Sequence, residues 1–127
     1  MSQKSKGTNA ERELVHLLWK RGVAAIRVAG SGSSRYPSPD ILAGTIERKF
    51  AIECKSLKGT TKYLPKDEVM ALQEFSNLFG CEAWIGVRFA RNEWFFVAPD
   101  DLHETKESYV VSLETVKVKG LLLEELL

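Results

Sequence analysis

The segment Pro39 to Lys55, PDILAGTIERKFAIECK, constrains the fold of this chain more than any other. Two short apolar runs in it flank a polar turn, which predicts a β-hairpin. Residues 65–80 then have the apolar spacing of a helix, with a proline in the first turn and a glycine at the end. CEAWIGVRFA, 81–90, reads as a strand, so this order predicts a βαβ crossover with parallel pairing. Because the hairpin adds antiparallel pairs, we expect an α/β fold with a mixed sheet.

The remaining chain contributes further short elements and fits a single domain over residues 1–127. No repeat or interdomain linker interrupts it. The expected elements are a helix at 8–22, strands at 23–29, 40–44, 50–56 and 94–99, a flexible loop at 30–39, an edge strand at 109–113 and a terminal helix at 120–127. Arg91, Asn92 and Glu93 are expected to connect the two strands of a second hairpin.

Three charged residues stand in the first hairpin where apolar ones would pack better. Strand alternation places Glu53 and Lys55 on one face. A turn centred between Ile46 and Glu47 puts Asp40 opposite Glu53, with Cβ atoms about 4.5 to 5.5 Å apart. Two carboxylates at that separation repel by roughly 3 kcal/mol at an effective dielectric near 20. A fold would ordinarily avoid such a cost.

A divalent cation reverses the sign of this repulsion, because Mg²⁺ binds one or two carboxylates together with water and phosphate oxygens. The ammonium of Lys55 can hold a water or a phosphate oxygen beside such an ion. A solvated strand face is the alternative, since an acid followed two residues later by Lys also occurs at 47–49 and 104–106. Glu11 has two readings as well: it closes a capping box that starts at Thr8, or it points toward the core side of its helix.

Charge is distributed unevenly along the chain, although the net charge is only +1. Residues 1–66 hold 13 Lys or Arg against 5 Asp or Glu, whereas residues 67–127 hold 5 against 12. A basic face directed at a polyanion, such as a phosphate backbone, would explain this asymmetry. The alternative is that the two halves mix in space.

Several classes of protein are disfavoured by what the motifs lack. The loop at 30–39 has neither the Gly-Lys-Ser/Thr ending of a P-loop nor the third glycine of a dinucleotide site, so no nucleotide cofactor is expected. Ser31 has no nucleophile-elbow pattern, and its hydroxyl could instead contact a scissile phosphate. Cys54 and Cys81 suggest neither a disulfide framework nor a zinc site. The polar start and the absence of a membrane-length apolar run predict a cytoplasmic protein without a membrane anchor.

The set Glu11, Pro39-Asp40 and Glu53-x-Lys55 resembles the PD-(D/E)XK nuclease superfamily. More narrowly, the chain resembles the archaeal Holliday junction resolvases over residues 6–127, through the segments GTNAERELVHLLWKRG, IRVAGSGSS, IECK, EFSNLFG and VSLETV, in this order. The resemblance implies a restriction-endonuclease-like core, in which helices flank a central mixed β-sheet. It also implies a homodimer that cleaves four-way DNA junctions with Mg²⁺, for which Mn²⁺ substitutes.

The resemblance also implies roles for individual residues. By this resemblance, Glu11, Asp40 and Glu53 bind the metal, and Lys55 orients or activates the attacking water. Ser31 corresponds best to a catalytic loop serine, with Ser33 as the alternative because the loop is longer here. Arg12 and Arg27 match basic residues needed for junction binding or cutting. The basic residues expected on the DNA-binding face are Lys4, Lys6, Arg12, Arg27, Arg35, Lys58 and Lys62.

The helix at 65–80 carries an unusually wide apolar stripe. Core packing is the default explanation for such a stripe. The resemblance implies that its phenylalanines help to form a dimer contact, so we expect the stripe to be shared between the core and a partner. The residues expected at the dimer interface are Leu72, Phe75 and Phe79.

The sequence therefore predicts a structure-selective endonuclease that makes paired nicks in four-way junctions during recombination and repair, associated with the nucleoid. One rival is a nuclease of restriction or repair type that cuts duplex DNA, although the short chain leaves little room for a base-reading domain. The other is a non-catalytic DNA-binding subunit whose carboxylates are only structural.

Overall fold

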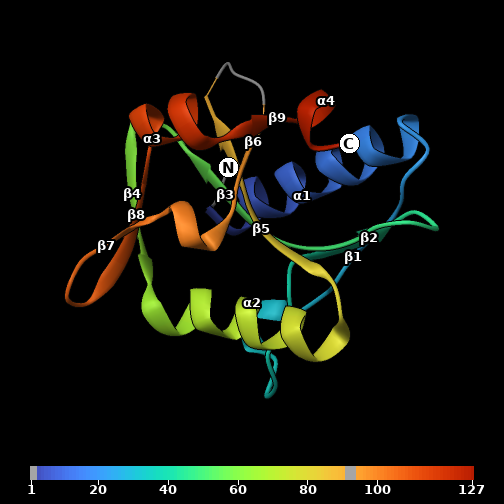
Figure 1. Ribbon diagram of the computed structural model, residues 1–127, viewed down its shortest axis with the longest axis horizontal. Helices are drawn as coiled ribbons and strands as arrows, with labels where there is room; N and C mark the ends of the chain where they lie inside the picture. Colours follow the sequence, from blue (N-terminus) through green and yellow to red (C-terminus); the bar gives the residue numbers. More distant parts are fainter. Residues whose placement is uncertain (1–2, 91–93) are drawn as a thin grey trace.

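The chain folds around a mixed β-sheet with helices on both faces (Figure 1). The computed structural model describes residues 3–90 and 94–127, and the side chains of residues 3–6 lie outside this description. In chain order the elements are α1 (Gln3–Lys20), β1 (Ala24–Arg27), the 3₁₀ helix η1 (Ser31–Ser33), β2 (Ile41–Gly44), β3 (Lys49–Leu57), β4 (Thr61–Pro65), α2 (Lys66–Phe79), β5 (Glu82–Phe89), β6 (Trp94–Val97), the 3₁₀ helix η2 (Pro99–Asp101), β7 (His103–Glu104), β8 (Ser108–Ser112), α3 (Leu113–Lys119), β9 (Leu121–Leu122) and α4 (Leu123–Leu126).

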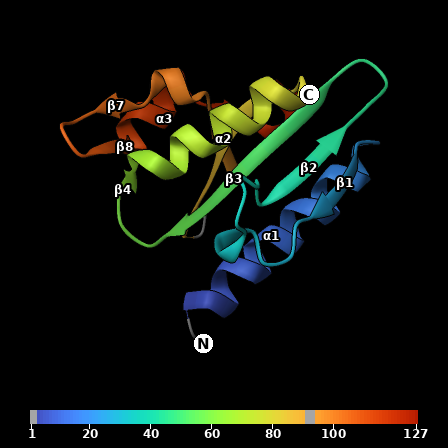
Figure 2. The same cartoon turned by 90° about the horizontal axis from the view of Figure 1, so that it is seen from below.

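The main sheet has the strand order β1-β2-β3-β5-β6-β9. Strands β3 and β5 are parallel and are joined through α2, whereas the other neighbours are antiparallel. This confirms the predicted crossover and the mixed sheet. A smaller antiparallel sheet, β4-β8-β7, lies at the opposite end of the molecule from β1 and β2 (Figure 2).

The β2–β3 hairpin has the predicted register. Ile41 pairs with Ile52, and Gly44 pairs with Lys49, so the turn is centred between residues 46 and 47. The Thr45 amide donates to the carbonyl of Arg48 at 2.7 Å, which closes the turn.

Strand alternation divides the core into two parts. Phe50 and Ile52 of β3 face α1, where they pack with Leu14 and Leu18 of that helix. Ala51, between them in the sequence, faces α2. Glu53 and Lys55 continue the α2-facing positions toward the end of the strand.

Several local predictions differ from the structure. Helix α1 begins at Gln3, so Thr8 lies inside the helix and the predicted capping box is wrong. Strand β4 and helix α3 were not predicted. Because β4 pairs with β8, the segment expected to form an edge strand lies in the middle of the smaller sheet. The paired strands β5 and β6 confirm the second hairpin, although its connecting residues 91–93 lie outside the described residues.

The C-terminal segment forms the short strand β9 and then the one-turn helix α4, where a single helix was predicted. Its leucines dock as expected, since Leu123 and Leu126 are buried against the α1 side of the core. None of the helices in the described part of the chain is long and apolar enough to cross a membrane.

Candidate active site

Asp40 lies at the open end of the β2–β3 hairpin, one residue before β2. The register places it opposite Glu53, as predicted. The Asp40 carboxylate accepts two hydrogen bonds: the Ser31 hydroxyl donates to Oδ1 at 2.6 Å, and the backbone amide of Cys54 donates to Oδ2 at 2.8 Å. The carboxylate is therefore fixed between the loop that precedes β2 and strand β3.

The geometry of the loop distinguishes its two candidate serines. Gly30 adopts a left-handed conformation with φ of 71°, which glycine tolerates, and this allows the chain to turn into η1. The Ser33 hydroxyl donates to the Gly30 carbonyl at 3.2 Å. Ser31 is thus the serine that contacts Asp40, while Ser33 closes a local turn.

Glu53 lies on the α2 face of the sheet and is largely buried. Burial, a side-chain hydrogen bond with Glu68 and the charge of Asp40 raise the pKa of Glu53 to about 10. Glu53 therefore retains its proton at neutral pH in the absence of a cation and shares it with Glu68. Positive charge nearby would lower this pKa, as that of Lys55 does in part, and a divalent cation would act in the same direction.

Glu68, in the first turn of α2, is a residue that the sequence did not single out. It forms an ion pair with Lys55, and it also contacts Glu53. Burial raises the pKa of Glu68, but hydrogen bonds from Glu53 and Lys55 outweigh burial and lower it. Burial lowers the pKa of Lys55, but the hydrogen bond and the negative charge of Glu68 raise it by more. The net effect is a raised pKa, so the amine is held as an ammonium ion.

Glu11 reaches the same region from α1. Its side chain is 15% exposed and lies 3.5 Å from the guanidinium of Arg27 on β1. Burial and the negative charge of Asp40 raise the pKa of Glu11, and Arg27 opposes this effect. Glu11 thus points inward, whereas Arg12, the next residue, is exposed. Asp40 is the common neighbour of Glu11 and Glu53, which approach from opposite faces of the sheet.

The three predicted metal ligands come within electrostatic range of one another, but two of them are turned toward other partners. Glu53 contacts Glu68, and Glu11 contacts Arg27. In the described part of the chain, no three acidic, His or Cys side chains form a ready-made metal site. Carboxylates are nevertheless the ligands that a hard divalent cation prefers, and the charge of Asp40 raises the pKa of both Glu11 and Glu53.

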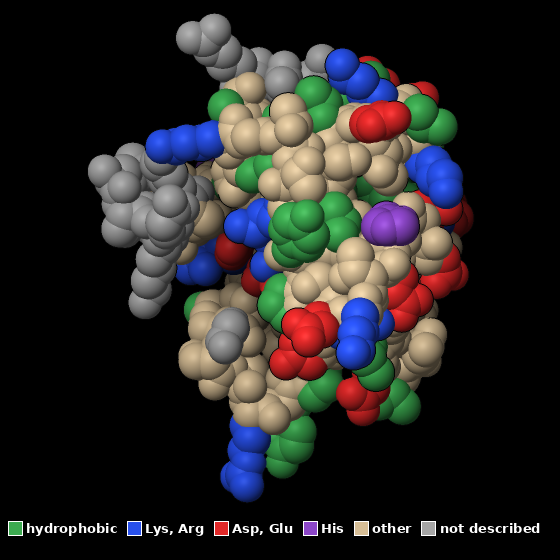
Figure 3. Space-filling view, turned by 90° about the vertical axis from the view of Figure 1, so that its left-hand side faces the viewer, with side chains coloured by type: hydrophobic (Ala, Val, Ile, Leu, Met, Phe, Trp, Pro, Cys, Tyr) green, Lys and Arg blue, Asp and Glu red, His purple; other side chains and the backbone are tan. Residues whose placement is uncertain are grey.

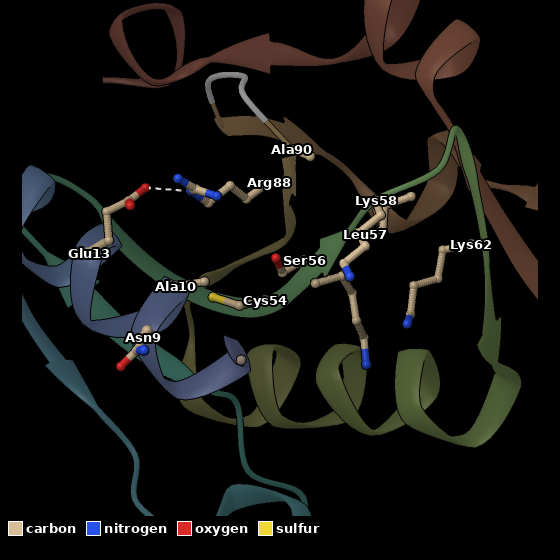
Figure 4. Close-up of a pocket in the computed structure, with 12 residues that line it drawn as sticks. Asn9, Ala10, Glu13, Cys54, Ser56, Leu57, Lys58, Lys62, Arg88 and Ala90 are labelled. Atoms are coloured by element: carbon tan, nitrogen blue, oxygen red, sulfur yellow. Dashed lines mark hydrogen bonds and ion pairs between the residues drawn. The ribbon is translucent and has the colours of Figure 1, made fainter. Parts of the chain in front are cut away.

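An open cavity of about 700 Å³ adjoins Lys55, between the first turns of α1 and the ends of β3 and β5. Lys58 and Lys62 line it across from α1 (Figure 4). In Figure 3, Lys and Arg side chains gather around a hollow in which acidic side chains are recessed. Of the other predicted DNA-binding residues, Arg35 is exposed on the loop, and the side chains of Lys4 and Lys6 lie outside the described residues.

Arg88 on β5 is a second lining residue that the sequence did not single out. Its Nε donates to Glu13 of α1 at 2.7 Å (Figure 4). Trp94 Nε1 donates to the same oxygen at 2.9 Å. Hydrogen bonds from Arg88 and Trp94 outweigh the effect of burial and lower the pKa of Glu13. These contacts join α1 to the ends of β5 and β6, and they hold a guanidinium at the cavity. Nothing in the local sequence distinguishes Arg88 from an ordinary surface arginine.

The residues expected at a dimer interface fall into two groups. Leu72 is only 3% exposed and packs in the core of its own chain, so its side chain is not available to a partner and this part of the prediction is corrected. Phe75 and Phe79 stack on each other with ring centroids 5.3 Å apart, and Phe79 is 55% exposed. An apolar groove of about 320 Å³ includes Phe79, together with Trp19 and Ile26.

Comparison with known proteins gives the same family at every level. A family model described as "Archaeal holliday junction resolvase (hjc)" matches residues 2–127. The crossover junction endodeoxyribonuclease Hjc of Archaeoglobus fulgidus is 43% identical, with 96% of this chain and 95% of that protein covered. The Hjc protein of Sulfolobus acidocaldarius is 38% identical, over 92% of this chain and 83% of its own length.

A solved structure extends the likeness to three dimensions. The structure of Archaeoglobus fulgidus Hjc, a Holliday junction resolvase, aligns with a TM-score of 0.89 and 40% identity, and covers 94% of this chain and 98% of that one. The helix-flanked mixed sheet is therefore a restriction-endonuclease-like α/β core. The chain belongs to the archaeal Holliday junction resolvase (Hjc) family.

Proposed function

We propose that this protein is a structure-selective endonuclease, a Holliday junction resolvase, that makes paired metal-dependent nicks in four-way DNA junctions during recombination and repair. One observation carries the proposal: Glu11 from α1, and Glu53 and Lys55 from β3, all lie within electrostatic range of the Asp40 carboxylate. Membership of the family and the names of its relatives supply the substrate. A cytoplasmic location at the nucleoid follows from that substrate.

In this proposal Glu11, Asp40 and Glu53 hold Mg²⁺, with Mn²⁺ as a substitute. When bound, the ion supplies a Lewis acid that polarises the phosphoryl oxygen. The chain's own residues position the reactants. The ammonium of Lys55 provides positive charge and hydrogen bonds at the phosphate or the attacking water. Ser31 holds Asp40 through its hydroxyl, and the proposal assigns to the same hydroxyl a contact with the scissile phosphate.

The DNA backbone would follow the basic hollow. Lys58, Lys62 and Arg88 line the cavity beside Lys55. Arg35 lines a second cavity together with Ser31 and Glu53. Contacts of this kind are made to phosphates, so they recognise the shape of the DNA and not its base sequence. Arg12, Arg27, Lys4 and Lys6 are retained as DNA-binding residues in the proposal, on the strength of the family resemblance alone.

A homodimer completes the proposal, because a four-way junction is nearly two-fold symmetric and paired nicks require two active sites. Phe75 and Phe79 remain candidates for the contact. The apolar groove with Trp19 and Ile26 supports them, because exposed apolar side chains that lie together mark protein interfaces more often than isolated ones do.

Three DNA substrates of equal length test the proposal: a synthetic four-way junction, a linear duplex and a Y-shaped fork, each incubated with the protein and Mg²⁺. We expect paired nicks in the junction and little cutting of the duplex. Equal cutting of the duplex would instead identify a nuclease of restriction or repair type. Binding of the junction without cleavage in Mg²⁺ or Mn²⁺ would identify a non-catalytic DNA-binding subunit.

A further inference from the structure

Helix α2 contributes a side chain to the proposed catalytic centre through its first turn. Glu68 Oε1 forms an ion pair with the Lys55 ammonium, and the side chains of Glu68 and Lys55 are only 27% and 18% exposed. Glu68 is also hydrogen-bonded to Glu53. A residue of α2 thus connects a proposed metal ligand with the proposed catalytic amine, which stand two positions apart on β3.

Helix-end electrostatics alone does not account for this arrangement. An acidic side chain in the first turn of a helix is favourable because it lies near the positive end of the helix dipole. Asp67 already supplies such a charge and remains exposed to solvent. Glu68 is instead half-buried, and both of its partners belong to the proposed site. The inward orientation of Glu68 therefore calls for a different explanation.

The flexibility of lysine suggests what Glu68 does. A lysine side chain has four rotatable bonds and loses up to about 2 kcal/mol of rotamer entropy when it is fixed. A catalytic group must nevertheless be held close to its productive position, because a displacement of about 1 Å can cost on the order of 100-fold in rate. Among the described residues, Glu68 is the one acidic side chain that forms an ion pair with Lys55.

We propose that Glu68 is a positioning residue that holds the Lys55 ammonium where it acts on the phosphate or the attacking water. The inference rests on the proposed function, in which Lys55 is catalytic. Removal of the Glu68 carboxylate leaves Lys55 free to swing toward solvent or toward Asp40. The phosphate contacts lie elsewhere in the hollow, so the loss falls on the rate of cleavage and not on DNA affinity.

The test compares Glu68→Gln with Asp67→Asn. Both substitutions are isosteric, remove one negative charge and lie in the same turn of α2, but only Glu68 contacts Lys55. Under single-turnover conditions, we expect Glu68→Gln to cut a four-way junction roughly 10- to 100-fold more slowly. Its affinity for the junction, and both properties of Asp67→Asn, should stay within about twofold of wild type.

A measurement that does not depend on cleavage checks the geometry. Limited acetylation of the full-length, DNA-free protein, read by mass spectrometry, reports how accessible and basic each lysine amine is. Lys55 should be acetylated several-fold faster in Glu68→Gln than in wild type, and at an unchanged rate in Asp67→Asn. Adding Glu68→Gln to Lys55→Ala should not reduce the residual cleavage rate any further, because Glu68 acts through Lys55.

The outcomes separate this inference from the proposed function. Wild-type cleavage by Glu68→Gln, with Lys55→Ala inactive, overturns the positioning role and leaves the proposed function intact. Slow cleavage by Glu68→Gln with unchanged acetylation of Lys55 also overturns it, since Glu68 would then act by another route. Wild-type cleavage by Lys55→Ala would show instead that the proposed catalytic site is wrong.

Discussion

Asp40 and Glu53 show how the site meets the cost of placing acidic groups together. The Asp40 carboxyl group accepts hydrogen bonds from two donors, the Ser31 hydroxyl and the Cys54 amide. Glu53, opposite it, escapes the repulsion by keeping a proton, and burial is the largest cause. A proton on Glu53 removes the repulsion that two neighbouring carboxylates would otherwise create.

The first prediction concerns how the stability of the folded protein depends on pH through Glu53. Its pKa in the folded chain, about 10, lies above its ordinary value of 4.5, so proton binding favours the folded state. This contribution is fully present below pH 4.5 and is lost progressively as the pH rises toward 10. Glu53→Gln, which is neutral at every pH, should therefore be more stable than wild type by up to about 5 kcal/mol at pH 8, in the absence of divalent ions.

Urea denaturation with a chelator present, at pH 5 and pH 8, measures this difference. The lowered pKa of Glu68 acts below pH 4.5, outside that window, so it does not cancel the effect. The advantage of Glu53→Gln should be small at pH 5 and should grow with pH. An equal advantage at both pH values would mean that Glu53 is ionised in the folded protein.

The loop serines give the second prediction. Ser31→Ala removes a hydrogen bond to a charged carboxylate, which is typically worth about 1.5 to 3 kcal/mol. Junction cleavage should fall roughly 10- to 100-fold if that bond holds Asp40 in its working position. Ser33→Ala is the matched control. In the described part of the chain, the Ser33 hydroxyl donates to the Gly30 carbonyl and makes no hydrogen bond to Asp40. Comparable losses in the two variants would refute a specific role for Ser31.

At the scale of elements, the β2–β3 hairpin illustrates what a sequence can predict. Alternation and a symmetric turn fix the register, because a shift of one residue would reverse every side chain between the two faces. The pairing of Ile41 with Ile52, and hence of Asp40 with Glu53, follows from this rule. Helix α2 was predictable from a different local signal, the glycine at its end. Gly80 ends the helix in a left-handed conformation, which glycine adopts readily.

Strand β4, helix α3 and the role of Glu68 were not predicted because their sequence patterns are weak or have another ordinary explanation. Among the residues of β4 only Leu64 is buried, and Lys62 on the same face lines the open cavity, so the apolar alternation of this strand is weak. Helix α3 is capped by the Ser112 hydroxyl, which accepts a hydrogen bond from the Thr115 amide, within a segment that otherwise reads as a strand. Glu68 was missed because an acid in the first turn of a helix has an ordinary explanation.

The third prediction tests how the hairpin turn is anchored. The Arg48 guanidinium donates two hydrogen bonds of 2.9 Å to Glu82 on β5, and it lies 4.7 Å from the Phe50 ring centroid. Lysine cannot reproduce this planar fork. Arg48→Lys should therefore lower the free energy of unfolding by about 1 kcal/mol, a modest loss because both side chains are 40% exposed.

Chemical denaturation measures this loss, with Arg21→Lys as the control. Arg21 is an exposed arginine just beyond the end of α1, so exchanging it for lysine should leave stability nearly unchanged. Equal stability of the two variants would show that the forked contact contributes nothing.

At the scale of the whole molecule, the two ends of α2 serve different purposes in this account. Its first turn contacts the catalytic centre through Glu68, and its last turn exposes Phe79 beside the apolar groove. The charge asymmetry of the sequence has a spatial counterpart, since Lys58 and Lys62 from the basic half line the cavity next to Lys55. The asymmetry is incomplete, because Arg88 of the acidic half lies there too.

The fourth prediction concerns assembly. If Phe79 lies in the contact of the proposed homodimer, Phe79→Asp should make the protein monomeric at micromolar concentration, because it would place a charge in an apolar contact. Leu78→Asp is the control: Leu78 is 84% exposed on the neighbouring position of α2 and is not part of the groove. Sedimentation velocity distinguishes the two states. A dimer that survives Phe79→Asp would place the interface on another surface.

The most direct measurement of the central claim pairs cleavage with binding for Asp40→Asn. Asp40 lies between Glu11 and Glu53, and Asn preserves its shape while removing its charge. With Mg²⁺ and a four-way junction, we expect Asp40→Asn to bind the junction as tightly as wild type but to cut it at least about 1000-fold more slowly, a loss of roughly 4 kcal/mol in transition-state stabilisation. Cleavage by Asp40→Asn at the wild-type rate would show that Asp40 is not part of the catalytic site.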